Sequence, residues 1–225
     1  MGKKYYKIGI IGGTGKEGKG LAYRWALAGH EVIIGSRLLT KAQEAVESLS
    51  ELLGESAHLL QGMENRDAVA NCEIAVIAVP YAAHRATLED LKDLLDGKIL
   101  IDVVVPIMPP QVTRVQMPAE GSVAQEAQAI LGDNCYVVDA FQNVSYERLM
   151  GKEDVDCDVL VCGRGKAARQ VVLGLVADTG LKGWDAGVIE NAVVVEGLTS
   201  VLIGLNIQHR VRAAGIRITG ISDQA

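Results

Sequence analysis

Apolar residues occur along the chain in two alternating patterns. Short continuous apolar runs are typical of strands buried on both faces of a parallel sheet, and they predict strands at residues 7–11, 30–35, 57–61, 73–79, 98–104 and 135–140. Between these runs apolar residues recur at helical spacing, which predicts helices at residues 18–29, 40–53, 65–70, 88–95 and 120–131. This alternation predicts an α/β fold, a Rossmann-type doubly wound parallel sheet with helices on both faces.

The pattern changes after residue 140. A polar segment at residues 141–145 follows a strand end and is expected to face the ligand crevice, and a charged loop is predicted at residues 151–156. Beyond it we predict strands at 158–163 and 182–186 and helices at 166–179 and 190–212. We therefore divide the chain into a Rossmann domain, residues 1–144, and a small α/β C-terminal domain, residues 145–225. The second is too short for its own core, so we expect it to pack on the first and to form a homodimer through the 190–212 helix.

The most informative motif is the segment IGIIGGTGKEGKG at residues 8–20. Gly13, Gly15 and Gly18 have the spacing G-x-G-x-x-G between a predicted strand and a predicted helix, which is the context of a dinucleotide-binding turn. The glycines allow a tight turn, close approach of a pyrophosphate and close packing of helix on strand, and the helix N-terminus attracts the phosphate charge. The sequence therefore predicts a dinucleotide cofactor here.

The end of the second strand indicates which dinucleotide binds. NAD-binding units place an acidic residue there for the ribose 2′-hydroxyl, whereas this chain has Ser36 and Arg37. A hydroxyl and a guanidinium suit the 2′-phosphate of NADP, and Lys41 lies one helical turn further as a second positive charge. The alternative is that Ser36 only caps the next helix and Arg37 points to solvent. We prefer NADP.

Composition narrows the partners and the compartment. Of the 225 residues 49% are hydrophobic and 22% charged, which suits a folded globular chain. The net charge of -6 argues against nucleic-acid and anionic-membrane partners. No signal peptide is recognised and no apolar run reaches the roughly 18 residues of a membrane span, so we expect a cytoplasmic protein. The four cysteines are expected to be buried in a reducing cytosol, with Cys157 and Cys162 as a metal or redox pair being the alternative.

The sequence lacks the usual acid–base and nucleophilic signatures. It has no Ser-His-Asp order, no nucleophile elbow, no P-loop lysine after the glycine turn and no lysine in residues 190–212. Their absence favours hydride transfer between two carriers, because the cofactors then supply the difficult chemistry. His84 is expected at the surface or at a helix cap, with an approach to the nicotinamide as the alternative.

Several segments together resemble a known enzyme family. The segments GIIGGTGKEGKGLA, GHEVIIGSR, IAVIAVPYAAH, FQNVS, DVLVCG, EGLTSVLIGLN and GIRITG are similar, in this order, to the NADPH-dependent coenzyme F420 reductases. The resemblance covers essentially the whole chain. It implies reversible hydride transfer between NADP(H) and coenzyme F420, an 8-hydroxy-5-deazaflavin. It also implies a homodimer whose small C-terminal domain helps to build the deazaflavin pocket.

The resemblance also implies roles for particular residues. The turn from Gly13 to Gly18, with Thr14, Lys16 and Glu17, would hold the pyrophosphate, and Ser36, Arg37 and Lys41 the 2′-phosphate. Val79, Pro80 and Val104 would contact the nicotinamide half of NADP. No catalytic residue is assigned, and Gln142, Asn143 and Val144 would line the place where the two rings stack.

Two positions depart from the family pattern. Leu38 stands where well-known members have a second basic residue, and Gln142 stands where they often have histidine. Glutamine can donate a hydrogen bond to a ring carbonyl but does not titrate near neutral pH. Two other functions therefore stay open: an NADPH-dependent reductase of an ordinary flavin or of a small carbonyl or imine, and a non-catalytic NADP-binding redox sensor.

Overall fold

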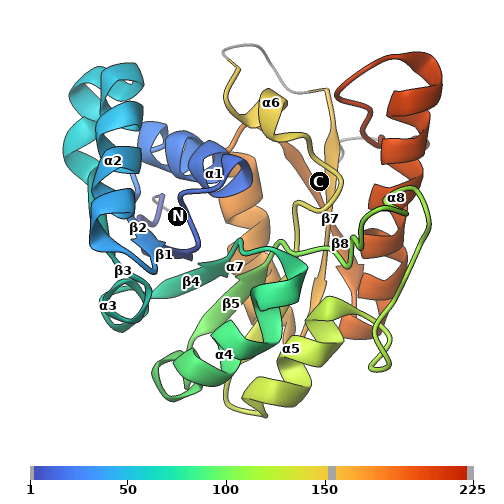
Figure 1. The fold of residues 1–225 in the computed structure, drawn as a ribbon, viewed down its shortest axis with the longest axis horizontal. Coiled ribbons are helices and arrows are strands. Elements are labelled where there is room, and N and C mark those ends of the chain that lie inside the picture. The colour runs from blue at the N-terminus through green and yellow to red at the C-terminus, as the bar shows by residue number, and fades with distance from the viewer. Residues whose placement is uncertain (1–2, 152–155, 222–225) are drawn as a thin grey trace.

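One eight-stranded sheet organises the whole chain. The computed structural model describes residues 3–151 and 156–221, and its strand order is β3-β2-β1-β4-β5-β6-β7-β8 (Figure 1). The strands are β1 (Lys7–Ile11), β2 (Glu31–Ser36), β3 (Leu60–Glu64), β4 (Ile74–Ile77), β5 (Ile99–Asp102), β6 (Tyr136–Asp139), β7 (Asp158–Gly163) and β8 (Lys182–Gly187). The first six are parallel, as the apolar runs predict, and β7 pairs antiparallel with β6.

Helices cover both faces of this sheet, which confirms the doubly wound architecture. The helices are α1 (Lys16–Leu27), α2 (Leu39–Leu53), α3 (Asn65–Ala70), α4 (Tyr81–Leu95), α5 (Val123–Leu131), α6 (Tyr146–Leu149), α7 (Lys166–Asp178) and α8 (Ala192–His209). One hydrophobic core contains buried residues of α1, α2 and α7, and a second contains those of α3, α4, α5 and the start of α8. The parallel strands are buried between these two cores.

The third strand lies later than the predicted range of residues 57–61. Residues Gly54–Leu59 form a 3₁₀ helix, and β3 pairs with β2 only from Leu60 onward, opposite Val32. Leu60 is also the only buried residue of β3. An edge strand with so few buried positions carries a weak apolar signal, which explains the shifted prediction.

Several helix ends also differ from the prediction. Helix α1 begins directly after Gly15, and α5 begins only at Val123, where the Ser122 hydroxyl accepts the backbone N–H of Gln125 at 3.1 Å. Helix α8 ends at His209, and the next residue, Arg210, has left-handed backbone angles. The short helix α6 was not predicted, and the charged loop predicted over residues 151–156 lies mostly outside the described residues.

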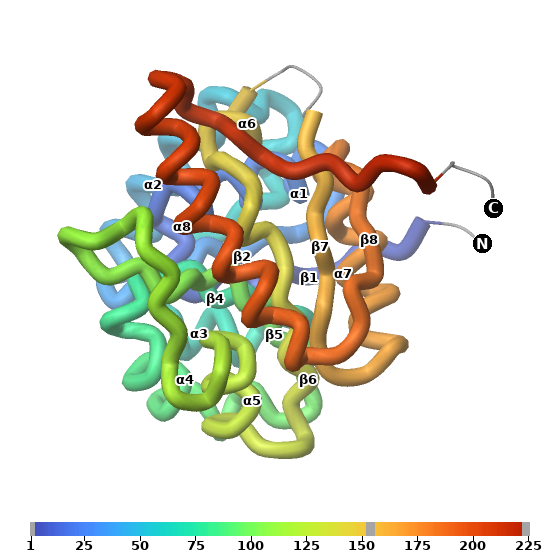
Figure 2. The backbone as a smooth tube through the Cα atoms, turned by 90° about the vertical axis from the view of Figure 1, so that its right-hand side faces the viewer, coloured from blue at the N-terminus to red at the C-terminus, as the bar shows by residue number. Residues whose placement is uncertain are grey.

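Helix α8 closes one side of the molecule. The loop before α5 packs along it: the Ser200 hydroxyl bonds the carbonyl oxygen of Arg114 at 3.3 Å, and the segment after α8 crosses β7, where Asp158 N–H donates to the Ile216 carbonyl at 2.8 Å (Figure 2). The continuous helical stretch Ile189–His209 has 21 residues and a mean hydropathy of 1.3. By length and composition alone this stretch could span a membrane, so the expectation that the chain has no such segment stays a prediction. Polar residues interrupt its apolar run, so no unbroken run is long enough, but the mean hydropathy of the stretch stays high.

Candidate active site

The chain changes direction across the sheet between β1 and β4. Strands β2 and β3 lie on one side of this pair and β5 to β8 on the other. In open α/β sheets ligands bind at the carboxyl ends of the strands at such a switch point. The loops after β1 and β4 touch there: a Cβ atom on Gly12, which has a φ of 71°, would lie 2.6 Å from Cγ1 of Val79. The site therefore lies where the sequence places the glycine turn and Val79.

Hydrogen bonds from its own N–H groups hold the glycine turn in place. The N–H of Gly13 is close to the carbonyl oxygens of Ile10 and Gly35, at 3.1 and 2.9 Å, and the N–H of Gly12 donates to Oδ1 of Asn65 at 3.2 Å. No side chain among the described residues caps the start of α1 at Gly15. The first N–H groups of α1 are therefore free to bind an anion, and the helix dipole favours one there.

A first cavity of about 340 Å³ lies beside this turn. Its walls come from the turn, the end of β2, α2, the start of α3, the loop after β4 and α4: Gly12, Thr14, Gly15, Ser36, Arg37, Leu38, Lys41, Asn65, Ala78, Val79, Pro80, Ala83 and Thr87. The cavity therefore brings together the turn residues, the basic residues and the Val79-Pro80 pair that the sequence predicts to share one ligand. An elongated ligand with phosphate groups suits these walls.

Ser36, Arg37 and Lys41 line this cavity and differ in whether their side chains already have a partner within the protein. Ser36 does not cap α2, since its hydroxyl accepts the N–H of Leu38 at 3.3 Å and Leu38 precedes the helix. The exposed guanidinium of Arg37 has no hydrogen-bond or ion-pair partner among the described residues. Lys41 is paired with Glu44 at 2.7 Å. Arg37 is therefore the cation most available for a phosphate.

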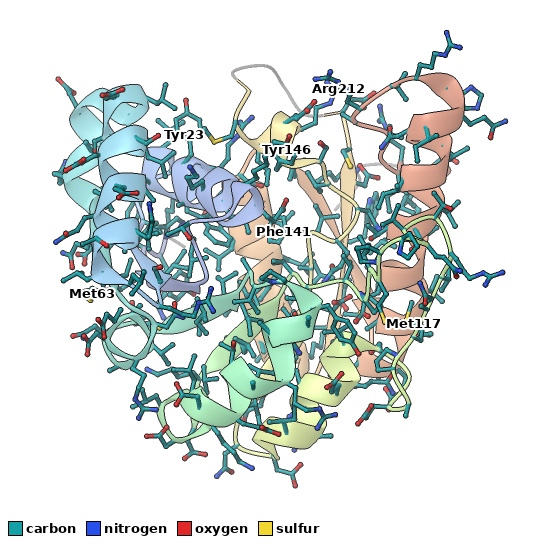
Figure 3. All side chains as sticks on the ribbon, in the orientation of Figure 1. Tyr23, Met63, Met117, Phe141, Tyr146 and Arg212 are labelled. Atoms are coloured by element: carbon teal, nitrogen blue, oxygen red, sulfur yellow. The ribbon has the colours of Figure 1, made fainter. Side chains whose placement is uncertain are left out.

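A second cavity of about 400 Å³ lies on the other side of the turn. It is lined by residues from α1, the loops after β5 and β6, α6, α8 and the segment that follows α8: Glu17, Val103, Val105, Ile107, Phe141, Gln142, Asn143, Val144, Ser145, Tyr146, Thr199, Leu202, Ile203, Asn206, Arg212 and Ala214. Phe141, Tyr146 and Arg212 lie between α1 and α8 (Figure 3). The predicted ring-stacking residues 142–144 thus share one mostly apolar cavity of a size that suits a planar ring.

Gln142 and Asn143 are fixed with their amide nitrogens turned into the protein. The side-chain Nε2 of Gln142 donates to the backbone carbonyl of Asp102 at 2.7 Å and to Oδ1 of Asp139, and Nδ2 of Asn143 donates to the carbonyl of Val195 at 2.9 Å. The amide oxygens of both residues are buried and have no hydrogen-bond partner among the described residues. Buried acceptors of this kind are costly, so they indicate a ligand that donates N–H or O–H groups.

A buried polar network lies beneath Gln142. Nε2 of His84 lies 2.8 Å from Oδ2 of Asp102, and both side chains are fully buried, so the expectation of a surface or capping histidine is wrong. Burial alone would lower the pKa of His84, but the Asp102 carboxylate raises it above its ordinary value. Burial also raises the pKa of Asp139. Asp102 and Asp139 of this network accept the hydrogen bonds that hold the side-chain amide of Gln142.

Glu196 joins this network from α8. Its two carboxylate oxygens accept the N–H groups of Val123 and Ala124 at 2.8 and 3.0 Å, which caps the start of α5. Burial raises the pKa of Glu196 to about 8, against the effect of these two hydrogen bonds. The acid therefore ties α8 to α5 below the second cavity.

Helix α1 also holds the loop that carries residues 141–149. The Trp25 ring meets Phe141 edge-on with centroids 5.8 Å apart, and Trp25 Nε1 donates to the Leu175 carbonyl at 2.9 Å. The Arg24 guanidinium donates to three carbonyls at the end of α6, those of Leu149, Arg148 and Gly151, at 2.7, 3.0 and 2.7 Å. The walls of both cavities are therefore attached to one helix.

Five of the predicted cofactor-binding residues do not line the first cavity. Gly13 and Gly18 pack backbone against backbone behind it, where a Cβ atom on Gly18 would lie 2.7 Å from Cα of Gly13. Lys16 points to α6, where its Nζ donates to the Tyr146 hydroxyl at 2.9 Å. Glu17 lines the second cavity, and Val104 is buried in the core while its neighbours Val103 and Val105 line the second cavity. Sequence reasoning missed Tyr146 and Thr199, because these come from separate parts of the chain and carry no local motif.

Known proteins similar to this chain share its full extent. The F420-dependent NADP reductase of Methanocaldococcus jannaschii is 40% identical, and the alignment covers 96% of this chain and 99% of that protein. The enzyme of the same name from Methanothermobacter thermautotrophicus is 41% identical, with 97% of each chain covered. The chain belongs to the F420-dependent NADP reductase family.

The other comparisons agree with this family. Residues 7–106 match the family model described as NADP oxidoreductase, coenzyme F420-dependent. A crystal structure of a putative F420-dependent NADP reductase from Arthrobacter sp. superimposes with a TM-score of 0.80, at 26% identity, and covers 96% of this chain and 100% of that one. The resemblance seen in the sequence is thereby confirmed, and with it an oxidoreductase on a Rossmann-type fold.

Proposed function

We propose that this chain transfers hydride reversibly between NADP(H) and coenzyme F420 at the junction of the two cavities. The observation that carries this proposal is their arrangement around a single turn. Thr14 and Gly15 line the first cavity and Glu17 lines the second. A dinucleotide in the first cavity would bring its nicotinamide end towards Val79 and Pro80, next to a second cavity that suits a ring.

The NADP(H) half of the site uses the first cavity. The N–H groups at the start of α1 would bind the pyrophosphate, and Ser36 and Arg37 the 2′-phosphate. Lys41 lines the same end of the cavity and would have to exchange Glu44 for the phosphate. With Arg37 as the one unpaired cation among the described lining residues, we assign it the main part in recognising NADP(H) over NAD(H).

The F420 half of the site uses the second cavity. The pyrimidine part of a deazaflavin carries a ring N–H, and the buried amide oxygens of Gln142 and Asn143 lack donors. The apolar walls, including Val144 and Leu202, suit the flat ring. The protein's role is then to hold the two rings face to face, with the reacting carbons roughly 3 to 3.5 Å apart.

Turnover with the two cofactors tests the proposal. Purified protein is mixed with NADPH and oxidised F420, and the absorbance of the deazaflavin is followed from pH 5 to pH 9. Bleaching is expected, and no bleaching at any pH would contradict the proposal. Turnover with FMN or riboflavin but not with F420 would instead identify a reductase of ordinary flavins.

We also propose a homodimer formed through α8. Val194, Val201 and Leu205 lie on one side of this helix at spacings of seven and four, and they are 61%, 48% and 40% exposed. Exposure of such an apolar stripe to water is unfavourable, and its burial between two subunits would remove that cost. A cytoplasmic location is proposed as well, supported by four buried, free cysteines.

A further inference from the structure

Glu17 carries a carboxyl group in the second cavity, away from the pyrophosphate that the resemblance implies for it, and the proposed cofactor binding does not use that group. It lies in the first turn of α1 and lines the cavity together with Phe141 and Val144. The residue as a whole is half-buried, but its Oε1 is shielded from water and has no hydrogen-bond partner among the described residues. Since an unpartnered buried carboxyl group is costly, its position indicates a group on the ligand that exchanges a proton with it.

The surroundings of Glu17 favour the neutral form of its carboxyl group. Burial raises the pKa of its carboxyl group from 4.5 to about 8, and no neighbouring charge contributes to that shift. The charged groups near it face elsewhere: Lys16 binds the Tyr146 hydroxyl, and Arg212 lies at the rim, where its side chain is 85% exposed and 4.0 Å from Glu147. An acid with a pKa this close to the working pH can both donate and accept a proton.

The reaction requires such an exchange. Oxidation of a dihydrodeazaflavin releases a hydride from a ring carbon and a proton from a ring nitrogen, whereas NADP⁺ accepts only the hydride. Most of the polar side chains lining the cavity, among them Gln142, Asn143 and Thr199, do not titrate near neutral pH. The acids Asp139 and Glu196 do not line the cavity, and their oxygens are bonded to Gln142 and to the start of α5. Glu17 is the carboxyl group among the described lining residues.

We propose that Glu17 is a catalytic residue that exchanges this proton with the deazaflavin. In the direction of NADP⁺ reduction, the ring N–H bond breaks and an O–H bond forms on the Glu17 carboxylate as the hydride passes to the nicotinamide. In the reverse direction the Glu17 carboxylic acid returns the proton to the ring nitrogen as NADPH delivers the hydride. The inference rests on the proposed function and adds a proton acceptor and donor to it.

The two directions should therefore depend on pH in opposite ways. NADP⁺ reduction needs the carboxylate, so kcat should rise as the pH increases through about 8. F420 reduction needs the acid, so kcat should fall over the same range. Both pH dependences are measured for wild-type protein and for Glu17→Gln, which keeps the shape of the side chain but cannot titrate. In Glu17→Gln the rise of kcat with pH in one direction and its fall in the other (the two pH limbs) should disappear, and kcat should fall at least about tenfold.

Two further variants make the result specific. Glu147→Gln removes an exposed carboxylate beside Tyr146 that does not line the cavity, and it should keep both pH limbs. Glu17→Asp keeps a titrating group and should keep the limbs at reduced kcat. Binding of NADPH, followed by its fluorescence, should be unchanged in Glu17→Gln and checks that the turn is intact.

The outcomes separate this inference from the proposed function. Wild-type protein that shows no turnover with F420 would overturn both. Wild-type turnover combined with unchanged pH limbs and unchanged kcat in Glu17→Gln would overturn the role of Glu17 alone. Loss of the limbs in Glu147→Gln as well would also overturn it, because the pH dependence would then not belong to the cavity acid.

Discussion

Substitution of Gly18 by alanine should damage the dinucleotide site through the backbone. A Cβ atom at Gly18 would lie 2.7 Å from Cα of Gly13 and 3.0 Å from its carbonyl carbon and oxygen. These are backbone atoms of a turn whose N–H groups are bonded to Ile10, Gly35 and Asn65, so they cannot turn aside. Reaching ordinary contact at 3.4 Å requires α1 and the turn to separate by about 0.7 Å.

The size of the effect follows from this displacement. Overpacking of a close contact costs about 1–3 kcal/mol of unfolding free energy, and in a chain of this length each kcal/mol lowers Tm by about 2–4 °C. The same displacement moves the first N–H groups of α1 away from the pyrophosphate. Because a hydrogen bond to a charged group contributes roughly 1.5–3 kcal/mol and each 1.4 kcal/mol is about tenfold in Kd, the Kd for NADPH should rise at least about tenfold. Thermal unfolding and a fluorescence titration with NADPH measure the two quantities.

Gly15→Ala is the matched control for this experiment. Its Cβ would lie 3.7 Å from the Gly12 carbonyl oxygen and 4.0 Å from that of Ala78, and its φ of -70° suits alanine. We expect a normal Tm, but weaker NADPH binding, because the methyl group would occupy the first cavity where the pyrophosphate approaches. A Gly18→Ala protein with the wild-type Tm and Kd would refute the reasoning.

Four further predictions concern separate parts of the structure. Arg37→Ala should raise KM for NADPH at least about tenfold more than KM for NADH, since a charged hydrogen bond contributes roughly 1.5–3 kcal/mol; equal changes in steady-state assays would exclude a role in recognising the phosphate. Arg24→Ala should lower the unfolding free energy by about 1.5–3 kcal/mol, measured with urea, since three carbonyls lose their donor. Val201→Asp should convert the proposed dimer to monomers in light scattering, whereas Leu52→Asp, on the exposed side of α2, should leave the wild-type oligomeric state unchanged. Burial favours the neutral form of Glu17, so the free energy of unfolding of the wild-type protein should fall as the pH rises from 4.5 to about 8. Over that range the free energy of unfolding of Glu17→Gln should rise by up to about 5 kcal/mol relative to that of the wild type. The same difference between variant and wild type at pH 4.5 and pH 8 would contradict a raised pKa of Glu17.

The sheet could be predicted from the sequence because its central strands are buried on both faces. Runs such as that of β4, Ile74–Ile77, contain four buried residues and leave no ambiguity about a strand. At the edge of the sheet β3 buries only Leu60, so the apolar pattern no longer fixes its position. The antiparallel pairing of β7 with β6 also leaves no mark in the sequence, because a strand has the same apolar pattern in either direction.

The site was predictable where one local motif supplied it. The turn at Gly13 to Gly18 and the pair Ser36-Arg37 each lie within a single β-α-β unit, where spacing alone determines which residues meet. The second cavity is assembled from five separate segments, and Thr199 is 57 residues from Gln142, whose carbonyl it binds at 2.8 Å. His84 shows the same limit, since its burial depends on Asp102, a partner 18 residues away on another element.

The attachment of the 141–149 loop to α1 bears on how precisely the two rings are aligned. One helix begins at the pyrophosphate turn, carries Glu17, and holds both Phe141 and the end of α6 through the neighbouring residues Trp25 and Arg24. In the proposed function the binding places for donor and acceptor are therefore connected through α1, and their separation is set by the fold of the chain. The length of α1 between the glycine turn and Trp25 therefore sets how far apart the two rings would lie. Substitutions in its second and third turns should change the rate of hydride transfer, although these residues contact neither cofactor.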